Sequence, residues 1–255
     1  MRVLVAGASG AIGMPLVRLL RHAGHQVVAV HRAPDGHVRL AAAGAVPVAA
    51  DVLDRDGLAR ALGGQRADAV IAELTALKKI PLRHADMAAT NRLRAEGTAN
   101  LLVAARQLGA RRFITASMVF GYGFGDWGGR VLTEADPFAP PGYGRFEQHL
   151  AALQLGERGT AYNIADDEPV SMAVMLTAMA AAVGAPRPVT VPGWLLAPLP
   201  FGKAIVTGGL RVANAKAKAE LGWHLRAPTY RDGLRLLAAY HRPPAGAASE
   251  EQARS

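Results

Sequence analysis

The sequence predicts an α/β protein with a doubly wound parallel sheet, and two patterns in the first half of the chain carry that prediction. Short apolar runs alternate there with segments of helical hydrophobic spacing, which predicts strands paired in parallel through helical crossovers. A glycine-rich turn follows the first apolar run directly, as it does in Rossmann-type dinucleotide-binding units. With 255 residues, 51% of them hydrophobic, the chain can bury a large core.

The elements follow one another in a regular order. Strands are expected at Arg2–Ala6, Gln26–His31, Val46–Ala49, Ala69–Ala72 and Arg112–Ala116. The first helix is Ile12–His22, because its apolar residues fall on one side. A short helix follows the second strand, a helix with an acidic cap covers Asp54–Leu62, and a long helix ends near Leu108. A later helix, Ser171–Val183, begins at a serine cap.

Composition divides the chain into three parts. Residues 1–165 form the predicted dinucleotide-binding domain, and 166–240 form a small, truncated C-terminal substrate region of helical or mixed structure. Residues 241–255 are rich in alanine, proline, glycine and charge, a composition that predicts a disordered tail.

Charge and composition argue against several classes of partner. The net charge is +9, but lysine and arginine are scattered and aromatic residues make up only 5%, so we expect no nucleic-acid partner. The weakly polar stretch Val189–Leu210 contains three prolines and Lys203, which argues against a membrane span. The absence of cysteine and a first apolar run too short for a signal peptide favour the cytoplasm.

The strongest motif is the turn between the first strand and the first helix, which reads GxxGxxG. Its residues are Gly7-Ala8-Ser9-Gly10-Ala11-Ile12-Gly13. The glycines would give a tight turn, close approach to a pyrophosphate and close packing of helix on strand. The helix N-terminus would add free N–H groups and a positive dipole end. We therefore expect Gly7, Ser9 and the residues 10–13 to bind the cofactor; the alternative is a glycine-rich turn without a ligand.

Residues at the ends of the next strands predict which dinucleotide is bound. His31 and Arg32 stand where NAD-specific proteins place an acid, and a guanidinium can pair with a 2′-phosphate, so NADP is expected, with NAD as the alternative cofactor. Alternatively, Arg32 is a surface residue without a ligand. The pair Asp51-Val52 would contact adenine, unless Asp51 only caps its turn. The pair Leu74-Thr75, after the fourth strand, completes the predicted cofactor-binding residues.

Together these residues resemble the extended short-chain dehydrogenase/reductases, also called the NAD-dependent epimerase/dehydratase family. The resemblance covers most of residues 1 to 240, and the set of motifs is specific although each alone is not. Besides the glycine turn it rests on Glu96-Gly97-Thr98-Ala99-Asn100-Leu101-Leu102, Arg112-Phe113-Ile114 leading to Ser117 and Tyr122-Gly123, Tyr162-Asn163-Ile164-Ala165-Asp166-Asp167-Glu168-Pro169, and Asn214-Ala215-Lys216 through Glu220-Leu221-Gly222-Trp223.

The resemblance implies a Ser or Thr, a Tyr and a Lys as catalytic groups, and the chain departs from this set. Tyr143 matches the tyrosine, but Glu147 stands at the lysine position, where a carboxylate would raise the pKa of the phenol. An ungapped alignment puts Met118 at the hydroxyl position, with Ser117 one residue early. Tyr143 and Ser117 are the catalytic candidates; alternatively, Tyr143 is an ordinary helix residue.

The chain is also shorter than the resemblance implies. The segment after the tyrosine helix runs almost directly into Tyr162-Asn163, so most of the usual substrate platform is missing. We expect Ala161–Ala165 to pair in the main sheet, because an edge strand would otherwise be exposed. The resemblance further implies that Met87–Leu108 and Tyr143–Gln154 are dimer faces.

Other motifs predict no additional chemistry. The acids Asp166-Asp167-Glu168 are adjacent and point in different directions, so a turn is expected rather than a metal site. The eight histidines lack metal-ligand spacing, and no Gly-x-Ser-x-Gly elbow indicates a serine hydrolase.

Three functional hypotheses follow. The first is an NADP-dependent oxidoreductase or epimerase/dehydratase acting on a small, sugar-like hydroxyl or carbonyl substrate. The second is a catalytically silent NADP sensor or interaction module, which the lost hydroxyl, lysine and platform favour. The third is a shortened family member with impaired function.

Overall fold

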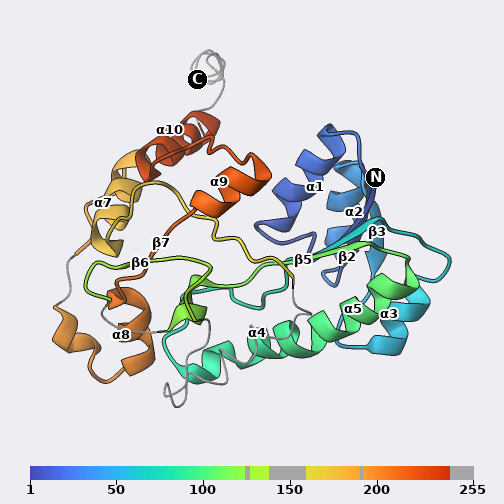
Figure 1. Ribbon diagram of the computed structural model, residues 1–255, viewed down its shortest axis with the longest axis horizontal. Coiled ribbons are helices and arrows are strands. Elements are labelled where there is room, and N and C mark those ends of the chain that lie inside the picture. Colours follow the sequence, from blue (N-terminus) through green and yellow to red (C-terminus); the bar gives the residue numbers. More distant parts are fainter. Residues whose placement is uncertain (124–126, 138–158, 190–191, 242–255) are drawn as a thin grey trace, which may run out of the picture. The chain divides into compact units, whose positions relative to one another are not determined.

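The computed structural model describes residues 1–123, 127–137, 159–189 and 192–241, whose course is drawn in Figure 1. By their contacts these residues form two compact units, one of 1–123 with Gly159 and one of 127–137 with 160–241. The boundary expected after residue 165 stays a prediction, and residues 242–255, on which the expected disordered tail falls, lie outside the described residues.

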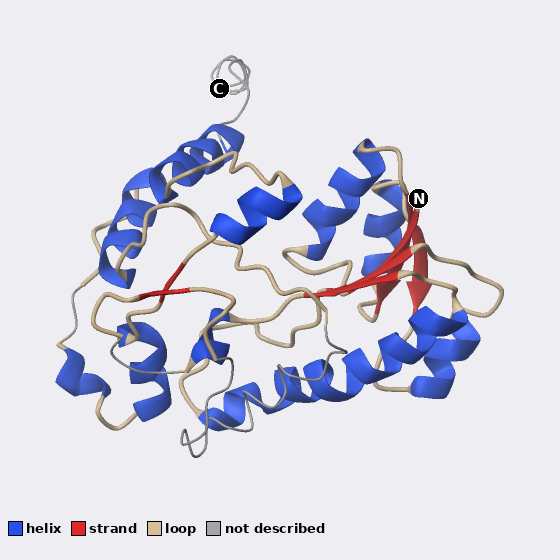
Figure 2. Cartoon of the chain, viewed as in Figure 1, coloured by secondary structure: helices blue, strands red, loops and turns tan. Residues whose placement is uncertain are grey.

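The first unit is built on a five-stranded parallel sheet of order β3-β2-β1-β4-β5 (Figure 2). Its strands are β1 Arg2–Ala6, β2 Gln26–His31, β3 Val46–Ala49, β4 Ala69–Ala72 and β5 Arg112–Thr115. The register pairs Arg2 with Gln26 across β1 and β2, and Val3 with Ala69 across β1 and β4. The chain moves outward from β1 to β3 and then returns to β4, so the strand order reverses between β1 and β4. The prediction of a Rossmann-type α/β sheet is confirmed.

Helices cover both faces of this sheet (Figure 1). They are α1 Gly13–His22 and α2 Gly36–Ala42 on one face, and α3 Arg55–Ala61 and α5 Thr98–Gln107 on the other. Successive strand residues point to opposite faces, so Val3 and Val5 pack with the first pair of helices and Leu4 with the second. The expected cap of α3 is present, since Asp54 Oδ1 accepts a hydrogen bond of 2.9 Å from Gly57 N.

The long helix before β5 is not uniform. It begins with a 3₁₀ turn, η1 His84–Met87, continues as α4 Ala88–Arg92, and then forms a π-helical segment, η2 Leu93–Gly97, before α5. A π-turn holds one residue more than an α-turn, and such turns are frequent at functional sites.

The second unit combines short strands with helices. Its elements are β6 Val131–Leu132, α7 Met172–Ala182, η5 Gly193–Leu196, α8 Pro200–Thr207, β7 Arg211–Val212, α9 Ala215–Leu221 and α10 Tyr230–His241. β6 and β7 pair in parallel, and α7 packs against α10. The serine cap expected for α7 is present, because Ser171 Oγ accepts from Val174 N at 3.3 Å. Within the described residues, no helix combines the length and the apolar character that a membrane crossing needs.

The expected pairing of Ala161–Ala165 with the main sheet is wrong. The segment has no regular secondary structure and belongs to the second unit. Its backbone groups bond to side chains instead: Asn163 N donates to Glu134 at 2.6 Å, and the Ala165 carbonyl accepts from Asn214 Nδ2 at 2.8 Å. Among the described strands, β5 is therefore an edge of the sheet, with Ile114 51% exposed.

The acids that follow this segment point to separate partners. Asp167 pairs with Lys218 at 2.5 Å, and Glu168 pairs with Arg231 at 2.6 Å. Both pairs tie the segment to α9 and α10, which gives these carboxylates a structural role.

The buried face of α5 generates a stability prediction. Leu101 is fully buried between α5 and the sheet, so Leu101→Ala should lower the free energy of unfolding by about 2–5 kcal/mol, measured by urea denaturation. Leu19→Ala is the control, because Leu19 is 58% exposed on α1 and its loss should cost under about 0.5 kcal/mol. Equal losses in the two variants would contradict the packing described for α5.

Candidate functional site

The loop after β1 lies against the backbone that follows β4, at the point where the strand order reverses. Gly7 has a φ of +79°, and a Cβ there would stand 2.9 Å from the carbonyl carbon of Glu73 and nearer still to its oxygen. The same strands are joined by a 3.0 Å hydrogen bond from Glu73 N to the Ala6 carbonyl. Position 7 therefore requires glycine for its conformation and for the close approach.

The rest of the loop forms an exposed backbone surface at the start of α1. A Cβ on Gly13 would stand 2.8 Å from Ala8 Cα and overlap the Gly7 carbonyl oxygen, whereas one on Gly10 would lie 3.2 Å from that oxygen. Ala11 is exposed, as are Gly10 and Ile12, and Ser9 is partly exposed. The first N–H groups of a helix have no partner within it, so this surface suits an anion such as a pyrophosphate.

Arg32, just after β2, is available to a ligand. Its side chain is 68% exposed and forms a loose ion pair with Asp51, 3.6 Å between Nη1 and Oδ2. Such a surface pair contributes at most about 1 kcal/mol. Asp51 also accepts a hydrogen bond of 2.9 Å from Leu53 N, so it caps its own turn as the alternative interpretation expects.

His31, the last residue of β2, directly precedes Arg32 in the chain and is only 5% exposed. Its Nδ1 donates to the Ala33 carbonyl at 2.9 Å, because a carbonyl can only accept. Its ring fills the space that a side chain on Gly36 would need. The buried imidazole thus shapes the turn between β2 and α2.

A side chain of the long helix positions the residues after β3 and β4. Asn100 Nδ2 donates to the Val52 carbonyl at 2.9 Å. Gly97, one turn earlier, lets Val52 and Leu74 approach closely, since a Cβ there would lie 3.0 and 3.1 Å from their side chains. Val52 and Leu74 are thereby brought together at the carboxyl edge of the sheet.

The loop after β4 is fixed by threonines and contains a half-buried acid. Ala76 N donates to Oγ1 of the buried Thr90 at 3.1 Å, and Leu77 N donates to Oγ1 of the exposed Thr75 at 3.1 Å. Burial raises the pKa of the Glu73 carboxyl. The folded pKa of Glu73 therefore lies above its unfolded pKa. Its contribution to the free energy of unfolding is fully present at pH values below the unfolded pKa and is lost as the pH rises through the folded pKa.

The end of β5 carries the one catalytic candidate within the described residues. Ser117 is exposed in the loop between β5 and the 3₁₀ turn η3 Val119–Tyr122. Its neighbour Met118 contacts Arg94, with 2.6 Å between the thioether sulfur and Nη1. Tyr143 and Glu147 lie outside the described residues, so the pairing of Ser117 with Tyr143 stays a prediction.

Several residues that shape this edge have no role assigned by sequence reasoning. Gly97 and Asn100 belong to a motif that supports the family resemblance, but the motif alone does not indicate their contacts with Val52. Arg94 and Thr90 carry no sequence signal, because their contacts depend on how the helix packs on the loops after β4 and β5.

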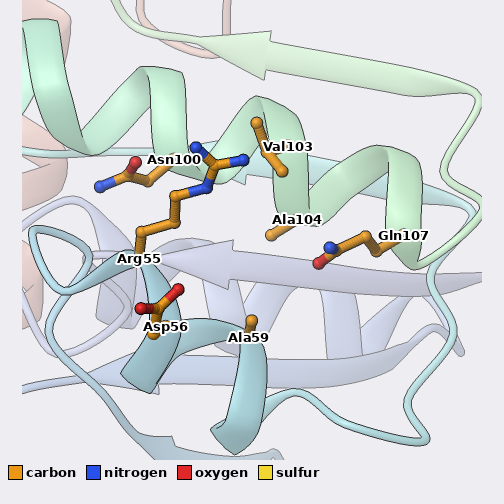
Figure 3. Close-up of a pocket in the computed structure, with 7 residues that line it drawn as sticks. All are labelled: Arg55, Asp56, Ala59, Asn100, Val103, Ala104 and Gln107. Carbon is orange, nitrogen blue, oxygen red and sulfur yellow. The ribbon is translucent and has the colours of Figure 1, made fainter.

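A separate hollow of about 430 Å³ lies between α3 and α5. Figure 3 shows the side chains from the two helices facing each other across it, Arg55, Asp56 and Ala59 from α3 and Asn100, Val103, Ala104 and Gln107 from α5. None of them belongs to the glycine loop, and we assign no ligand to this hollow. Among the described residues, no three histidine or acidic side chains converge as a metal site would require.

Comparisons with known proteins agree with the fold. Residues 3–165 match the model of the NAD dependent epimerase/dehydratase family. The 3-diazoavenalumate denitrifying reductase of a Streptomyces species is 32% identical over 312 aligned positions, covering 92% of this chain and 99% of the relative. Because that alignment exceeds the 255 residues of the chain, the relative has residues without a counterpart here.

Two solved structures share the fold. WbmG of Bordetella bronchiseptica, crystallised with NAD, has a TM-score of 0.67 at 19% identity and 94% coverage of both chains. A conserved protein of unknown function from Silicibacter pomeroyi has a TM-score of 0.64 at 21% identity, covering 94% of this chain and 98% of its own.

The contact at Gly7 can be tested by a matched pair of substitutions. Gly24 has the same φ of +79° but nothing within 4 Å of a Cβ, so Gly24→Ala should cost only the conformational penalty, about 1–2 kcal/mol. Gly7→Ala should cost about 2 kcal/mol more, because the Glu73 backbone must also move. Urea unfolding of both variants measures the difference, and equal midpoints would show that the two strands do not approach as described.

Proposed function

The chain belongs to the NAD dependent epimerase/dehydratase family, and we propose that it works as a nicotinamide-dinucleotide-dependent reductase. The observation that carries the proposal is the construction of the loop Gly7–Gly13. A side chain at either end of the loop, Gly7 or Gly13, would clash with backbone atoms, and the residues between them lie exposed at the start of α1. That construction fits a pyrophosphate. Identity of 32% to a reductase, across nearly the whole chain, supports reduction over the other reactions of the family.

The predicted cofactor residues would divide the dinucleotide among them. Ser9 and the exposed residues 10–12 would face the phosphates, while Val52 and Leu74, held by the long helix, would enclose the adenine with Asp51 and Thr75 beside it. His31 would act through the turn that it supports. When bound, a reduced nicotinamide supplies a hydride.

Arg32 supports NADP as the preferred cofactor. Its guanidinium is exposed and only loosely paired, so a 2′-phosphate can replace Asp51 as its partner. The same Asp51 carboxylate would repel a phosphate and accept a hydrogen bond from a ribose hydroxyl, which keeps NAD as the alternative.

The cofactor proposal predicts a selective effect of Arg32→Ala. NADPH should bind about tenfold or more weakly, because a charge-assisted contact is lost, while the Kd for NADH should change less than about twofold. Fluorescence titration of the reduced nucleotides measures both affinities. Arg39→Ala, which removes an arginine paired with Asp35 on α2, is the control and should change neither.

A second variant tests the loop itself. A Cβ on Gly10 would lie 3.2 Å from the Gly7 carbonyl oxygen, a tight contact that a small shift of the loop relieves, so Gly10→Asp should fold, and its carboxylate should abolish binding of both nucleotides. Folded wild-type protein that binds neither NADPH nor NADH would overturn the proposed function.

The replaced catalytic residues bear on which hydride acceptor the protein can reduce. Ser117 and Tyr143 are the proposed hydroxyl donors for a small carbonyl substrate, but Met118 and Glu147 replace the groups that normally assist them. An acceptor that is already strongly electrophilic takes a hydride without a proton from the protein. The Streptomyces relative is named for a diazo compound, and an aryl diazonium ion belongs to this class. The hydride adds to its terminal nitrogen, and the aryldiazene formed loses N2 and leaves an aryl C–H bond. We therefore propose such acceptors beside carbonyls.

Two matched acceptors separate these possibilities. With 4-carboxybenzaldehyde, Ser117→Ala and Tyr143→Phe should each slow NADPH oxidation by about 10²–10⁴, the usual cost of losing a general acid. With 4-carboxybenzenediazonium, the same variants should retain their rate within about tenfold. Protein-free samples correct for direct reaction with NADPH. Large losses with both acceptors would contradict the hydride-only proposal.

A silent NADP-binding module is the second candidate, favoured by Met118 and Glu147 at the usual catalytic positions. It predicts nucleotide binding without NADPH oxidation by either acceptor. A homodimer through Met87–Leu108 and a location in the cytoplasm also stay predictions.

A further inference from the structure

Arg94 is a half-buried cation at the carboxyl edge of the sheet. It lies in the π-helical segment Leu93–Gly97, and its guanidinium extends toward the loop after β5. Burial lowers its pKa, although a guanidinium stays charged at neutral pH. The positive charge is therefore held where water solvates it incompletely, and such a charge is costly unless it is paired.

The partners of this guanidinium within the described residues do not balance its charge. Nη1 donates to the Met118 sulfur at 2.6 Å, and a thioether is a weak, neutral acceptor. Nε is buried without a hydrogen-bond partner. No described carboxylate forms an ion pair with Arg94, and the nearby Glu96 is already paired with Arg92 at 2.9 Å.

Arg94 lies at the edge of the sheet where open α/β folds bind their ligands. Ligands of open α/β sheets bind outside the carboxyl ends of the strands, and Arg94 meets the chain just after β5, beside the exposed Ser117. The glycine loop follows β1 at the same edge of the parallel sheet. The π-turn that carries Arg94 ends at Gly97, which borders Val52 and Leu74.

We infer that Arg94 binds the carboxylate of a small organic acid, which is the hydride acceptor. A guanidinium offers a planar fork of donors that matches a carboxylate, and such an anion would balance its charge. The Met118 thioether beside it offers an apolar, polarisable surface on which an aromatic ring can pack. The carboxylate site stands on the geometry of Arg94 alone. That the bound acid is also the hydride acceptor rests on the proposed reductase function.

Calorimetric titration with three aromatic acids and their amides tests the inference. Benzoate, phenylacetate and cinnamate differ in reach, and each amide keeps the shape without the charge. In wild-type protein at least one acid should bind about tenfold or more tightly than its amide. Arg94→Met should reduce that preference below about twofold, and Arg94→Lys should keep part of it, since charge remains without the fork.

Arg92→Met is the matched control, because it removes an arginine two residues away that is 60% exposed and paired with Glu96. It should keep the full preference for the acid. Thermal unfolding adds a readout that separates binding from structure. Because Arg94 loses only its bond to a weak, neutral thioether acceptor, Arg94→Met should have a Tm equal to or above that of Arg92→Met.

The inference is overturned if none of the three acids is preferred over its amide, if Arg94→Met keeps the preference, or if Arg94→Met melts below Arg92→Met. Titrations with and without NADPH keep the two proposals apart. If the protein prefers an acid to its amide but binds neither NADPH nor NADH, the proposed reductase function is overturned and the proposed carboxylate site stands. If the protein binds a nucleotide but prefers none of the acids, the proposed carboxylate site is overturned and the proposed reductase function stands.

Discussion

The close approach of Gly7 to the Glu73 backbone is the contact on which the proposed nucleotide-binding edge depends. It occurs where β1 and β4 pair and the strand order reverses, so the loop after β1 can spread over the sheet edge only if no side chain intervenes. The left-handed conformation of Gly7 turns the chain toward α1, and Gly13 then lets the helix begin directly on the loop. Both the exposed backbone surface proposed to bind the pyrophosphate and the direction of α1 follow from these two glycines.

The long helix before β5 is the second organising element. Through Asn100 and Gly97 it fixes the residues after β3 and β4, and through Thr90 it holds the loop after β4. Arg94 connects the same helix to the loop after β5. One helix thus sets the positions of three of the loops at the sheet edge, so a change in its packing affects both ends of the site.

The sequence was sufficient to predict the sheet and the glycine loop, because both leave local signals. Strand runs such as Gln26–His31 and caps such as Asp54 and Ser171 depend on residues close in the chain. The interior of the long helix could not be predicted in the same way, since hydrophobic spacing does not reveal one extra residue in a turn. The contact between Arg94 and Met118 joins residues 24 apart in the chain and leaves no pattern.

The error at Ala161–Ala165 has a similar origin. The pairing was expected because an edge strand would otherwise be exposed, but the hydrogen bonds of this segment go to the side chains of Glu134 and Asn214, which are remote in the sequence. The argument from an exposed sheet edge therefore could not identify the partners that this segment takes.

The π-turn at Leu93–Gly97 also suggests how such a site can diversify. A π-turn differs from an α-turn by one residue, so a single inserted codon can create it. Such an insertion would leave Gly97 and Asn100 in place beside Val52 and would rotate the residues before them about the helix axis. If Arg94 meets the substrate as proposed, such a change can replace that side chain and leave the residues that enclose the proposed cofactor pocket in place, which makes this turn a natural point of divergence between relatives that share a nucleotide but not a substrate.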